Sequence, residues 1–548
     1  MRRICAFVLF VWAVSFASTA AAQIGGAAIT GIVVDAAGSP VAGAAVTITS
    51  VSTRSSRSAV TADGGGFFVG ALRPGTYRVK IELSGFRSLL REGVNLSTGE
   101  TVQLNLALEV GSVAESVTVE GDASLLRSAV SGLGHVVDNQ KVVELPLNGR
   151  SFITLATLVP GVAVPPPPAA PFPRINGGRP RTNQYLFDGI SVLQPEPGQV
   201  AFFPNVDAIL EFKIESNSPA AEFGRFNGGV VNLTTKSGTN GFHGTLFEFL
   251  RHESLNARNL FQPTGPKPEF RRNQFGGVAG GPMKRDRTFF FGDYQGQRQT
   301  IARTVISTVP TVLQRQGIFI EAIAGRVPII YDPETGTTTR EQFPGNTIPV
   351  SRIDPVARTL LDRYPQPTTE GTANNYRRTG NETVDHDLAS FRIDHRMADA
   401  DHMFARLTRF SETFIPVTPL PEGSGVTSGT LGPQDTTSWS FASSYQRTMS
   451  SSLLNELRVG DTRRTVGRSA ARLAGTPSSI LGIPGIPTTA EFPDTLPTFL
   501  IAGYQQLGSP PNTASNFATS VTQIADSVTW LKGRHTVKMG ADLRWERL

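Results

Sequence analysis

The stretch HTVKMGADLRWER, residues 535–547, alternates between apolar and polar side chains along its whole length. Its apolar positions are Val537, Met539, Ala541, Leu543 and Trp545. The positions between them include two cations and one acid, a pattern typical of a β-strand with one apolar and one polar face. If the apolar face meets lipid, turning the strand over costs roughly 2–4 kcal/mol for each Lys or Arg placed near the bilayer midplane. The register of this strand is therefore strongly fixed.

The segments before this strand repeat the pattern. Residues 521–531 form a strand that leads into it through Lys532-Gly533-Arg534, and the pair LASFRIDHRM and HMFARLTRF is joined by residues 398–401. Strands of about ten residues suit a tilted crossing of a bilayer, whereas most strands of soluble proteins have about five or six. The pattern is compatible with a large antiparallel transmembrane β-barrel over residues 241–548. Alternation alone leaves open a large secreted array of β-sandwiches.

The N-terminus predicts export. In MRRICAFVLFVWAVSFASTAAAQ, Arg2 and Arg3 supply the positive end, residues 4–16 the apolar run, and residues 20–22 a small-residue cleavage site. We therefore expect residues 1–22 to be a signal peptide. Because Cys5 is the single cysteine of the chain, the exported protein would have none, which excludes disulfides, thiol nucleophiles and cysteine-based metal sites.

Composition narrows the function classes. The 548 residues include 55 glycines and 38 prolines, and the short Val/Thr/Phe-rich runs between them indicate a mainly β protein. The formal net charge of +6 is spread along the chain rather than gathered in a basic block, which argues against a nucleic-acid partner. No Ser/His/Asp arrangement, pair of carboxylates or HExxH motif stands out, so we expect no enzyme activity and no cofactor.

Two motifs that could bind ligands have simpler interpretations. His386, His395 and His402 fall across two predicted strands and a turn without a fixed ligand spacing, so we expect no metal site. The run GGVAGG, residues 276–281, lacks the Lys-Ser/Thr and the helix that a phosphate loop needs. Glycine inside a strand marks a bend or a close backbone approach.

Residues 23–110 show the pattern of a small β-sandwich. In GTYRVKIELSGF, apolar residues alternate with charged ones from Tyr77 to Leu83, and Val102 to Leu108 repeat the alternation. Turn signals lie at residues 38–40, 63–64 and 74–75. The stretches TGIVVDAAGSPVAGAAVTI and TADGGGFFVGALRPGTYRVKIELSGF resemble the carboxypeptidase regulatory-like domain. The resemblance implies a transthyretin-like sandwich that serves as a binding or scaffold module without an active site.

Residues 124–240 mix helical and extended patterns. The segment VVDNQKVVELPLNGRSFITLATLVPGV has helical character around a Pro-Leu-Asn-Gly turn, and Pro165 to Pro168 form a stiff spacer. Residues 209–214 and 230–234 have the composition of strands. Before them lies RINGGRPRTNQYLFDGI, residues 174–190. Taken alone, this stretch allows a phosphate cradle, a nucleic-acid contact or a turn beside a hairpin.

The order of these pieces resembles TonB-dependent outer-membrane receptors of the Oar-like branch. The stretches similar to the plug of that family are LPLNGRSFITLATLVPGV, RINGGRPRTNQYLFDGI and AEFGRFNGGVVNLTTKSGTNGFHGTLFEF. Those similar to the start of its barrel are RRNQFGGVAGGPMKRDRTFFFGDYQGQR and WLKGRHTVKMGADLRWER. The resemblance implies an α+β plug over residues 124–240 and the N-terminal part of a barrel that has 22 strands when complete. Residues 241–548 suffice for roughly half of such a barrel, so we expect a truncated product or a fragment.

The resemblance also assigns roles in the plug. It implies a structural or gating role for seven residues: Arg174, Asn176, Gly177, Arg179, Arg181, Asp188 and Gly189. We expect residues 185–187 to form a short strand with Asp188-Gly189 as its turn. We expect the three arginines to pair with acids on the inner barrel wall, because buried guanidinium groups need partners and their planar fork fits carboxylates.

The segment between sandwich and plug, residues 111–123, contains AESVTVEGDA. It is either a linker or a strand that adds to the edge of another protein's sheet. The resemblance places the TonB box of the family here, with the candidate residues Glu115, Ser116, Val117, Thr118 and Val119. The implied partners are TonB with its inner-membrane energising complex, outer-membrane lipid, and an unknown extracellular substrate (a glycan, siderophore or peptide).

The resemblance therefore implies energy-coupled passage of a substrate across the outer membrane of a Gram-negative bacterium, with the N-terminal domain in the periplasm. Two alternatives differ in class. One is a surface protein that serves binding or adhesion without transport, and the other is a role in protein export, as the Oar branch suggests.

Overall fold

A computed structural model describes residues 26–112, 116–119, 133–165, 172–195, 198–258, 260, 267–323, 325–425, 432–483, 485–486, 494–510, 513–532 and 535–548. The predicted signal peptide, most of the polyproline run and the turn residues Gly533 and Arg534 lie outside these ranges. Within them the chain consists mainly of strands, and no helix is long and apolar enough to cross a membrane.

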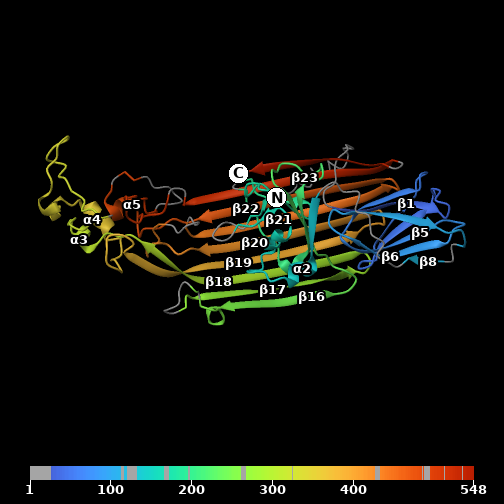
Figure 1. Cartoon of the computed structure of the whole chain (residues 1–548), viewed down its shortest axis with the longest axis horizontal. Coiled ribbons are helices and arrows are strands. Elements are labelled where there is room, and N and C mark those ends of the chain that lie inside the picture. Colours follow the sequence, from blue (N-terminus) through green and yellow to red (C-terminus); the bar gives the residue numbers. More distant parts are fainter. Residues whose placement is uncertain are drawn as a thin grey trace.

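The N-terminal unit is a β-sandwich, drawn in blue in Figure 1. One sheet has the strand order β4-β1-β7 and the other the order β3-β2-β5-β6-β8. The strands of the sandwich proper are β1 (Ala27–Asp35), β2 (Ala45–Ser50), β3 (Ser56–Val60), β4 (Gly66–Leu72), β5 (Gly75–Glu82), β6 (Ser88–Leu96) and β7 (Thr101–Leu108). Alternate residues of β5 and β7, among them Val79, Ile81, Val102 and Leu108, are buried in one apolar core. The period-two pattern of the sequence is thus the inward face of each strand.

A short strand joins the second sheet from beyond the sandwich proper. Strand β8 (Ser116–Val119) pairs in parallel with Ser88–Arg91 of β6 and forms the edge of that sheet. Four of the five TonB-box candidates are therefore held as a strand against the sandwich, and Glu115 lies outside the described residues.

The plug is an α+β unit around a five-stranded sheet of order β13-β12-β15-β14-β9. Its elements are β9 (Leu133–Asp138), α2 (Asn139–Glu144), η1 (Phe152–Leu158), β10 (Val162–Ala163), β11 (Arg174–Ile175), β12 (Gln184–Phe187), β13 (Ile190–Ser191), η2 (Val206–Ala208), β14 (Ile209–Asn217) and β15 (Val230–Thr235). Phe152, Phe187 and Phe212 lie in its apolar core, where aromatic rings meet edge to face. The predicted strands at 209–214 and 230–234 are β14 and β15, and the predicted strand at 185–187 is β12.

The remaining strands form one antiparallel sheet in sequence order, which we call the barrel wall. They are β16 (His243–His252), β17 (Phe270–Lys284), β18 (Thr288–Ser307), β19 (Tyr376–Arg396), β20 (Asp401–Ile415), β21 (Gln434–Ser450), β22 (Leu453–Arg468), β23 (Ser515–Lys532) and β24 (His535–Arg547). The connections alternate between short turns at one end, such as residues 397–400, and long segments at the other, such as residues 308–375. The long segments carry η3 (Glu253–Leu255), α3 (Val312–Arg315), η4 (Pro344–Asn346), η5 (Val350–Arg352), α4 (Pro355–Leu361) and α5 (Pro477–Leu481).

The barrel wall has an apolar outer face and a polar inner face. On β24, Met539, Leu543 and Trp545 are exposed on the outside, whereas Asp542 and Arg544 are partly buried on the inside. The register predicted from residues 535–547 is therefore confirmed. Neighbouring strands follow the same rule, because the inner face carries buried polar residues that include Gln274, Asp293, Arg392, Arg406, Ser438, Glu456, Thr462 and Gln523.

The three units meet at defined places. The plug packs against the inner face of the wall, and the sandwich lies at the short-turn end, opposite the end that carries α3, α4 and α5 (Figure 1). The backbone N–H of Asn240 donates to the carbonyl of Ser52 in the sandwich, and the side chain of Asn240 donates to Asp286 in the turn between β17 and β18 at 2.6 Å. The segment that follows the last plug strand is thus in direct contact with both the sandwich and a short turn of the wall.

Candidate functional site

The Asp188-Gly189 turn of the plug lies between β12 and β13 and faces the barrel wall. Both residues have positive φ, 49° for Asp188 and 83° for Gly189. Asp and Gly are among the residues that adopt this region most readily, which explains why a tight turn forms here. The backbone N–H of Asp188 donates to the carbonyl of Leu233 at 2.9 Å, and this bond ties the turn to β15.

The carboxylate of Asp188 is buried and fully engaged. It accepts hydrogen bonds from the backbone N–H of Thr235 at 3.0 Å and from its hydroxyl at 2.8 Å. On the wall side it pairs with Arg392 of β19 at 3.0 Å and Arg406 of β20 at 2.8 Å, and all three side chains are less than 5% exposed. Burial by itself raises the pKa of Asp188, but the two guanidinium groups and Thr235 outweigh it and hold the pKa well below its ordinary range. The plug is therefore anchored to the wall by an ionised acid.

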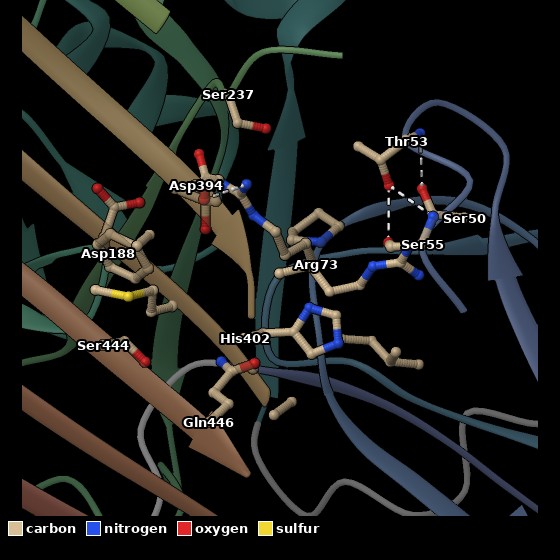
Figure 2. A pocket seen from close by; sticks show the side chains of 18 of the residues that line it. Ser50, Thr53, Ser55, Arg73, Asp188, Ser237, Asp394, His402, Ser444 and Gln446 are labelled. Atoms are coloured by element: carbon tan, nitrogen blue, oxygen red, sulfur yellow. Dashed lines mark hydrogen bonds and ion pairs between the residues drawn. The ribbon is translucent and has the colours of Figure 1, made fainter. Parts of the chain in front are cut away.

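A first chain of contacts leads from Asp188 across the wall to the sandwich. Arg392 also donates to Asp394, with Nε at 3.0 Å and Nη2 at 3.1 Å from its oxygens. Asp394 in turn accepts from Nη1 of Arg73, in the segment between β4 and β5, at 2.7 Å. Figure 2 shows Arg73 and Asp394 meeting beside Asp188. Asp188, Arg392, Asp394 and Arg73 form what we call the first relay.

A second chain starts at Gly189. A Cβ at this position would lie 2.2 Å from Nη1 of Arg458, so the guanidinium group rests directly on the glycine. Arg458 pairs with Glu456 at 2.8 Å, and Glu456 accepts from Gln446 at 2.8 Å. The amide oxygen of Gln446 accepts from Arg57 of β3 at 2.6 Å. Gly189, Arg458, Glu456, Gln446 and Arg57 form what we call the second relay, which also ends in the sandwich.

The two relays border a pocket of about 170 Å³ between the sandwich, the plug turn and the wall. Arg73, Asp188, Asp394, His402 and Gln446 line it, and Figure 2 shows their side chains. Among these residues Arg73 and Asp394 form an ion pair, Asp188 is paired with Arg392, and Gln446 is hydrogen-bonded to Arg57 and Glu456. This arrangement of side chains is suited to holding the sandwich, the plug and the wall together, rather than to catalysing a reaction.

The sandwich also contacts the plug directly. In the loop between β6 and β7, the fully buried Thr98 donates its backbone N–H to the carboxylate of Glu211 on β14. The hydroxyl groups of Thr98 and Thr234 on β15 are 2.8 Å apart. Burial raises the pKa of Glu211, and the hydrogen bonds from Thr98 oppose that rise.

Further polar contacts hold the hairpin after Asp188-Gly189 against the wall. The backbone N–H of Ser191 donates to Gln523 at 2.8 Å, and the carbonyl of Ser191 accepts from Thr462 at 3.2 Å. Three residues further along the same segment, Gln194 accepts from Thr519 at 2.6 Å. These contacts are hydrogen bonds with side chains of the wall, which water can replace if the segment moves, and beside them Ile190 packs against Gly460 of β22.

Comparison with known proteins agrees with this architecture. Residues 234–548, more than half of the chain, match the family described as outer membrane β-barrel domain. The chain belongs to the outer-membrane β-barrel family. Residues 28–109 of this barrel protein match the carboxypeptidase regulatory-like domain, as their sequence predicted. The protein is thus located in the outer membrane of a Gram-negative bacterium, and the predicted mainly β fold is confirmed.

The TonB-dependent transporter Oar of Myxococcus xanthus is 28% identical over 289 residues, which make up 48% of the barrel protein and 26% of that relative. The chain spans about a quarter of the length of this curated relative. Similar solved structures include the outer membrane transporter YddB of Escherichia coli (TM-score 0.44, 12% identity, 73% of this chain and 45% of that one). Another is the siderophore receptor PirA of Acinetobacter baumannii (TM-score 0.40, 13% identity, 73% and 45%). The resemblance to Oar-like TonB-dependent receptors is confirmed, and the three relatives named here are two transporters and one receptor.

The structure separates the seven predicted plug residues into two groups. Asp188 and Gly189 lie at the site, whereas Arg174, Arg179 and Arg181 are exposed and Asn176 and Gly177 form a turn. The guanidinium group of Arg181 lies over the ring of Phe172 at 5.5 Å. Among the described residues, no ion pair joins Arg174 or Arg179 to an acid. At Asp188 the charge pairing has the opposite polarity to the one expected, because the plug supplies the acid and the wall the arginines. The expected polarity occurs at another plug residue, Arg225, which pairs with Glu546 of β24 at 2.8 Å.

The other sequence motifs have structural roles. Among the described residues, no group of three or more His, Cys, Asp or Glu could hold a metal ion, and His395 instead shares a hydrogen bond with Thr288 at 2.8 Å. The GGVAGG run lies in β17, where a Cβ at Gly276 would be 2.1 Å from the carbonyl oxygen of Tyr294. It is the close backbone approach that the sequence indicated.

Sequence reasoning missed the arginines of both relays. Arg392 and Asp394 are two residues apart on β19, and Glu456 and Arg458 are two apart on β22. In a strand this spacing places both charges on one face, here the inner one. Opposite charges at i and i+2 on a barrel strand were therefore an available signal for residues that contact the plug.

Proposed function

We propose that the barrel protein is a TonB-dependent outer-membrane transporter, in which energy supplied through TonB moves the plug and lets a substrate pass. The observation that carries this proposal is the engagement of Asp188 by Arg392 and Arg406. A plug that had only to seal or support the barrel could be joined to it by a continuous apolar core. Apolar contacts are present as well, because Leu186 and Val230 pack against Ala525, and Ala208 packs against Val278 and Phe291. At Asp188, however, buried ion pairs and hydrogen bonds join the two surfaces, and such contacts can separate and re-form in water, as a gate requires.

The two ends of the barrel wall differ, and this difference indicates the side from which TonB would act. Outer-membrane barrels have short turns on the periplasmic side and longer loops outside. On this basis the sandwich and β8 face the periplasm, where TonB acts, and the loops with α3, α4 and α5 face the outside. The proposed partners are TonB, with its inner-membrane energising complex, and an extracellular glycan, siderophore or peptide.

Binding of TonB tests this function directly. The full chain, purified from outer membranes, is mixed with the periplasmic domain of TonB, alongside a variant that lacks Glu115 to Val119. We expect the full chain to bind and the deletion variant to lose binding while it is still recovered from the outer membrane in the same amount. Equal binding by both proteins would show that this segment is not the TonB box.

A cysteine scan locates the contact more closely. Because the exported chain is expected to lack cysteine, single replacements such as Val117→Cys can be cross-linked to cysteines in TonB without background. The matched control is Asp63→Cys, in a turn of the sandwich away from β8. Cross-links at Val117 but not at Asp63 are expected. A surface protein without transport would form neither, and that result would reject the transporter proposal.

A further inference from the structure

We propose that the carboxypeptidase regulatory-like sandwich is a latch on the plug. It occupies the short-turn mouth of the barrel, carries the coupling strand β8 in its own sheet, and leaves the mouth before the plug moves. The part of this proposal that concerns β8 rests on the proposed function, whereas the latch itself rests on contacts between the three units.

The first argument is where the sandwich touches the rest of the chain. Arg73 contacts β19, Arg57 contacts β21, and Gly70 of β4 lies against Leu454 of β22. At the same time Thr98 is hydrogen-bonded to β14 and β15 of the plug. The sandwich therefore bridges from several wall strands to the plug across the same end of the barrel. A plug strand that leaves through this end meets the sandwich first.

The second argument is that both relays converge on one plug turn. Each relay begins at Asp188 or Gly189 and ends at an arginine of the sandwich, Arg73 or Arg57. In the first relay Asp394 has two cationic partners, Arg73 and Arg392. When Arg73 leaves, Asp394 depends on Arg392 alone and competes with Asp188 for it. Departure of the sandwich thus weakens the ion pair between Asp188 and Arg392 that anchors the plug. The sandwich therefore leaves first and the plug moves second, as a latch requires.

The third argument concerns β8. Its four residues pair with β6 in parallel and lie at the edge of the sheet, so a partner strand can add to the other side of β8 while β6 still holds it. Three residues separate β8 from Ser112 of the sandwich unit, whereas 13 separate it from Leu133 of the plug. At a maximum of about 3.5 Å per residue, these connections can extend by roughly 10 Å and 45 Å. A pull on β8 therefore loads the sandwich before it loads the plug.

A reversible disulfide tests the latch in the full chain. The hydroxyl oxygens of Thr98 and Thr234 are 2.8 Å apart, so cysteines at these two positions can join the sandwich to the plug. A third replacement, Ser191→Cys, reports plug movement, because Ser191 is 2% exposed and becomes reactive to a maleimide only when its segment leaves the wall. The maleimide is applied to energised cells that contain TonB, with Ser191→Cys alone as the reference.

The expected result is that labelling of Cys at position 191 depends on the proton-motive force in the reference protein. In the protein with Thr98→Cys and Thr234→Cys, labelling falls to the rate of de-energised cells and returns when the disulfide is reduced. The matched control is Thr47→Cys with Ser58→Cys, whose hydroxyl oxygens are 3.3 Å apart within the sandwich. This pair staples the sandwich to itself, and labelling at position 191 should be unaffected.

The outcomes separate the latch from the proposed function. If the locked protein still binds the TonB periplasmic domain and labelling at position 191 continues, the sandwich is not a latch although the transporter proposal stands. If the reference protein shows no energy-dependent labelling and no TonB binding, the transporter proposal fails with the coupling role of β8. The latch is supported only by retained TonB binding together with labelling that is lost on oxidation and restored on reduction.

Discussion

At the scale of residues, the anchor of the plug depends on one ionised carboxylate. Asp188 neutralises part of the charge of Arg392 and Arg406, both of which are buried on the inner wall. Burying an ion pair is often close to neutral in free energy, but removing one partner leaves a buried charge without compensation. The site is therefore more sensitive to loss of Asp188 than its few contacts suggest.

We predict that Asp188→Asn destabilises the packing of the plug against the wall by about 3–5 kcal/mol at neutral pH. The free energy of plug unfolding is measured by urea titration in detergent micelles, with amide hydrogen exchange in β12 and β15 as the readout. The control is Asp399→Asn, whose side chain is 91% exposed and should change little. Equal stability of both variants would contradict the assigned role of Asp188.

The same comparison has a defined pH dependence. Because the folded-state pKa of Asp188 lies below its unfolded value, its stabilising contribution is present above the ordinary pKa of about 4 and is lost as the pH falls towards the folded value. The difference between wild type and Asp188→Asn should therefore be constant near neutrality and shrink in strong acid. A difference that grew as the pH fell would contradict an ionised Asp188.

Gly189 allows a second prediction at this scale. Gly189→Ala places a Cβ 2.2 Å from Arg458, whereas Gly177→Ala meets nothing within 4 Å, and both glycines have positive φ. We expect Gly177→Ala to cost about 1–2 kcal/mol from backbone strain alone. Gly189→Ala should cost roughly 1–3 kcal/mol more, because Arg458 must move from Glu456. The free energy of plug unfolding of both variants is measured in the same urea titration. Equal losses of stability would show that Arg458 can move aside without a cost in free energy.

At the scale of elements, each wall strand is fixed by the contrast between its faces. Phe441 lies near the middle of β21 and points outward, 37% exposed, while its neighbour Ala442 is fully buried. Phe441→Arg should cost roughly 2–4 kcal/mol, because it places a cation against lipid near the midplane. Phe441→Leu keeps the face apolar and serves as the control. The free energy of folding from urea into phospholipid vesicles is measured for both variants. Similar free energies would place Phe441 outside the membrane.

Elements were largely predictable from sequence because the period-two pattern is local. The strand at 535–547 and the short turn before β20 follow from such patterns, whereas the strand at 185–187 was implied by the family resemblance. Strand length did not follow: β19 has 21 residues, since pairing with neighbours extends it beyond the roughly ten that a bilayer crossing needs. The partners of Asp188 were also not predictable. Arg392 and Arg406 lie about two hundred residues further on, and the register between plug and wall that brings them together is not encoded in any local pattern.

At the scale of the whole molecule, the plug turn, the wall and the sandwich share one network of charges. Arg73 and Asp188 belong to different units and do not touch, yet Asp394 and Arg392 connect them. Replacement of residues that are far apart and share no partners is usually additive in free energy. If a replacement in the sandwich and a replacement in the plug change the free energy of unfolding non-additively, the first relay couples the two units.

We predict that Arg73→Ala and Asp188→Asn are not additive. Without Arg73, Asp394 draws Arg392 away from Asp188, so Asp188→Asn should cost at least about 0.5 kcal/mol less in the Arg73→Ala background than in the wild type. The four proteins of this cycle are compared by the free energy of plug unfolding in urea. Arg78 provides the control, because it pairs with Glu92 on the surface of the sandwich and is 55% exposed. Arg78→Ala should be additive with Asp188→Asn, and additivity in both cycles would mean that the sandwich is held at the mouth without influencing the anchor of the plug.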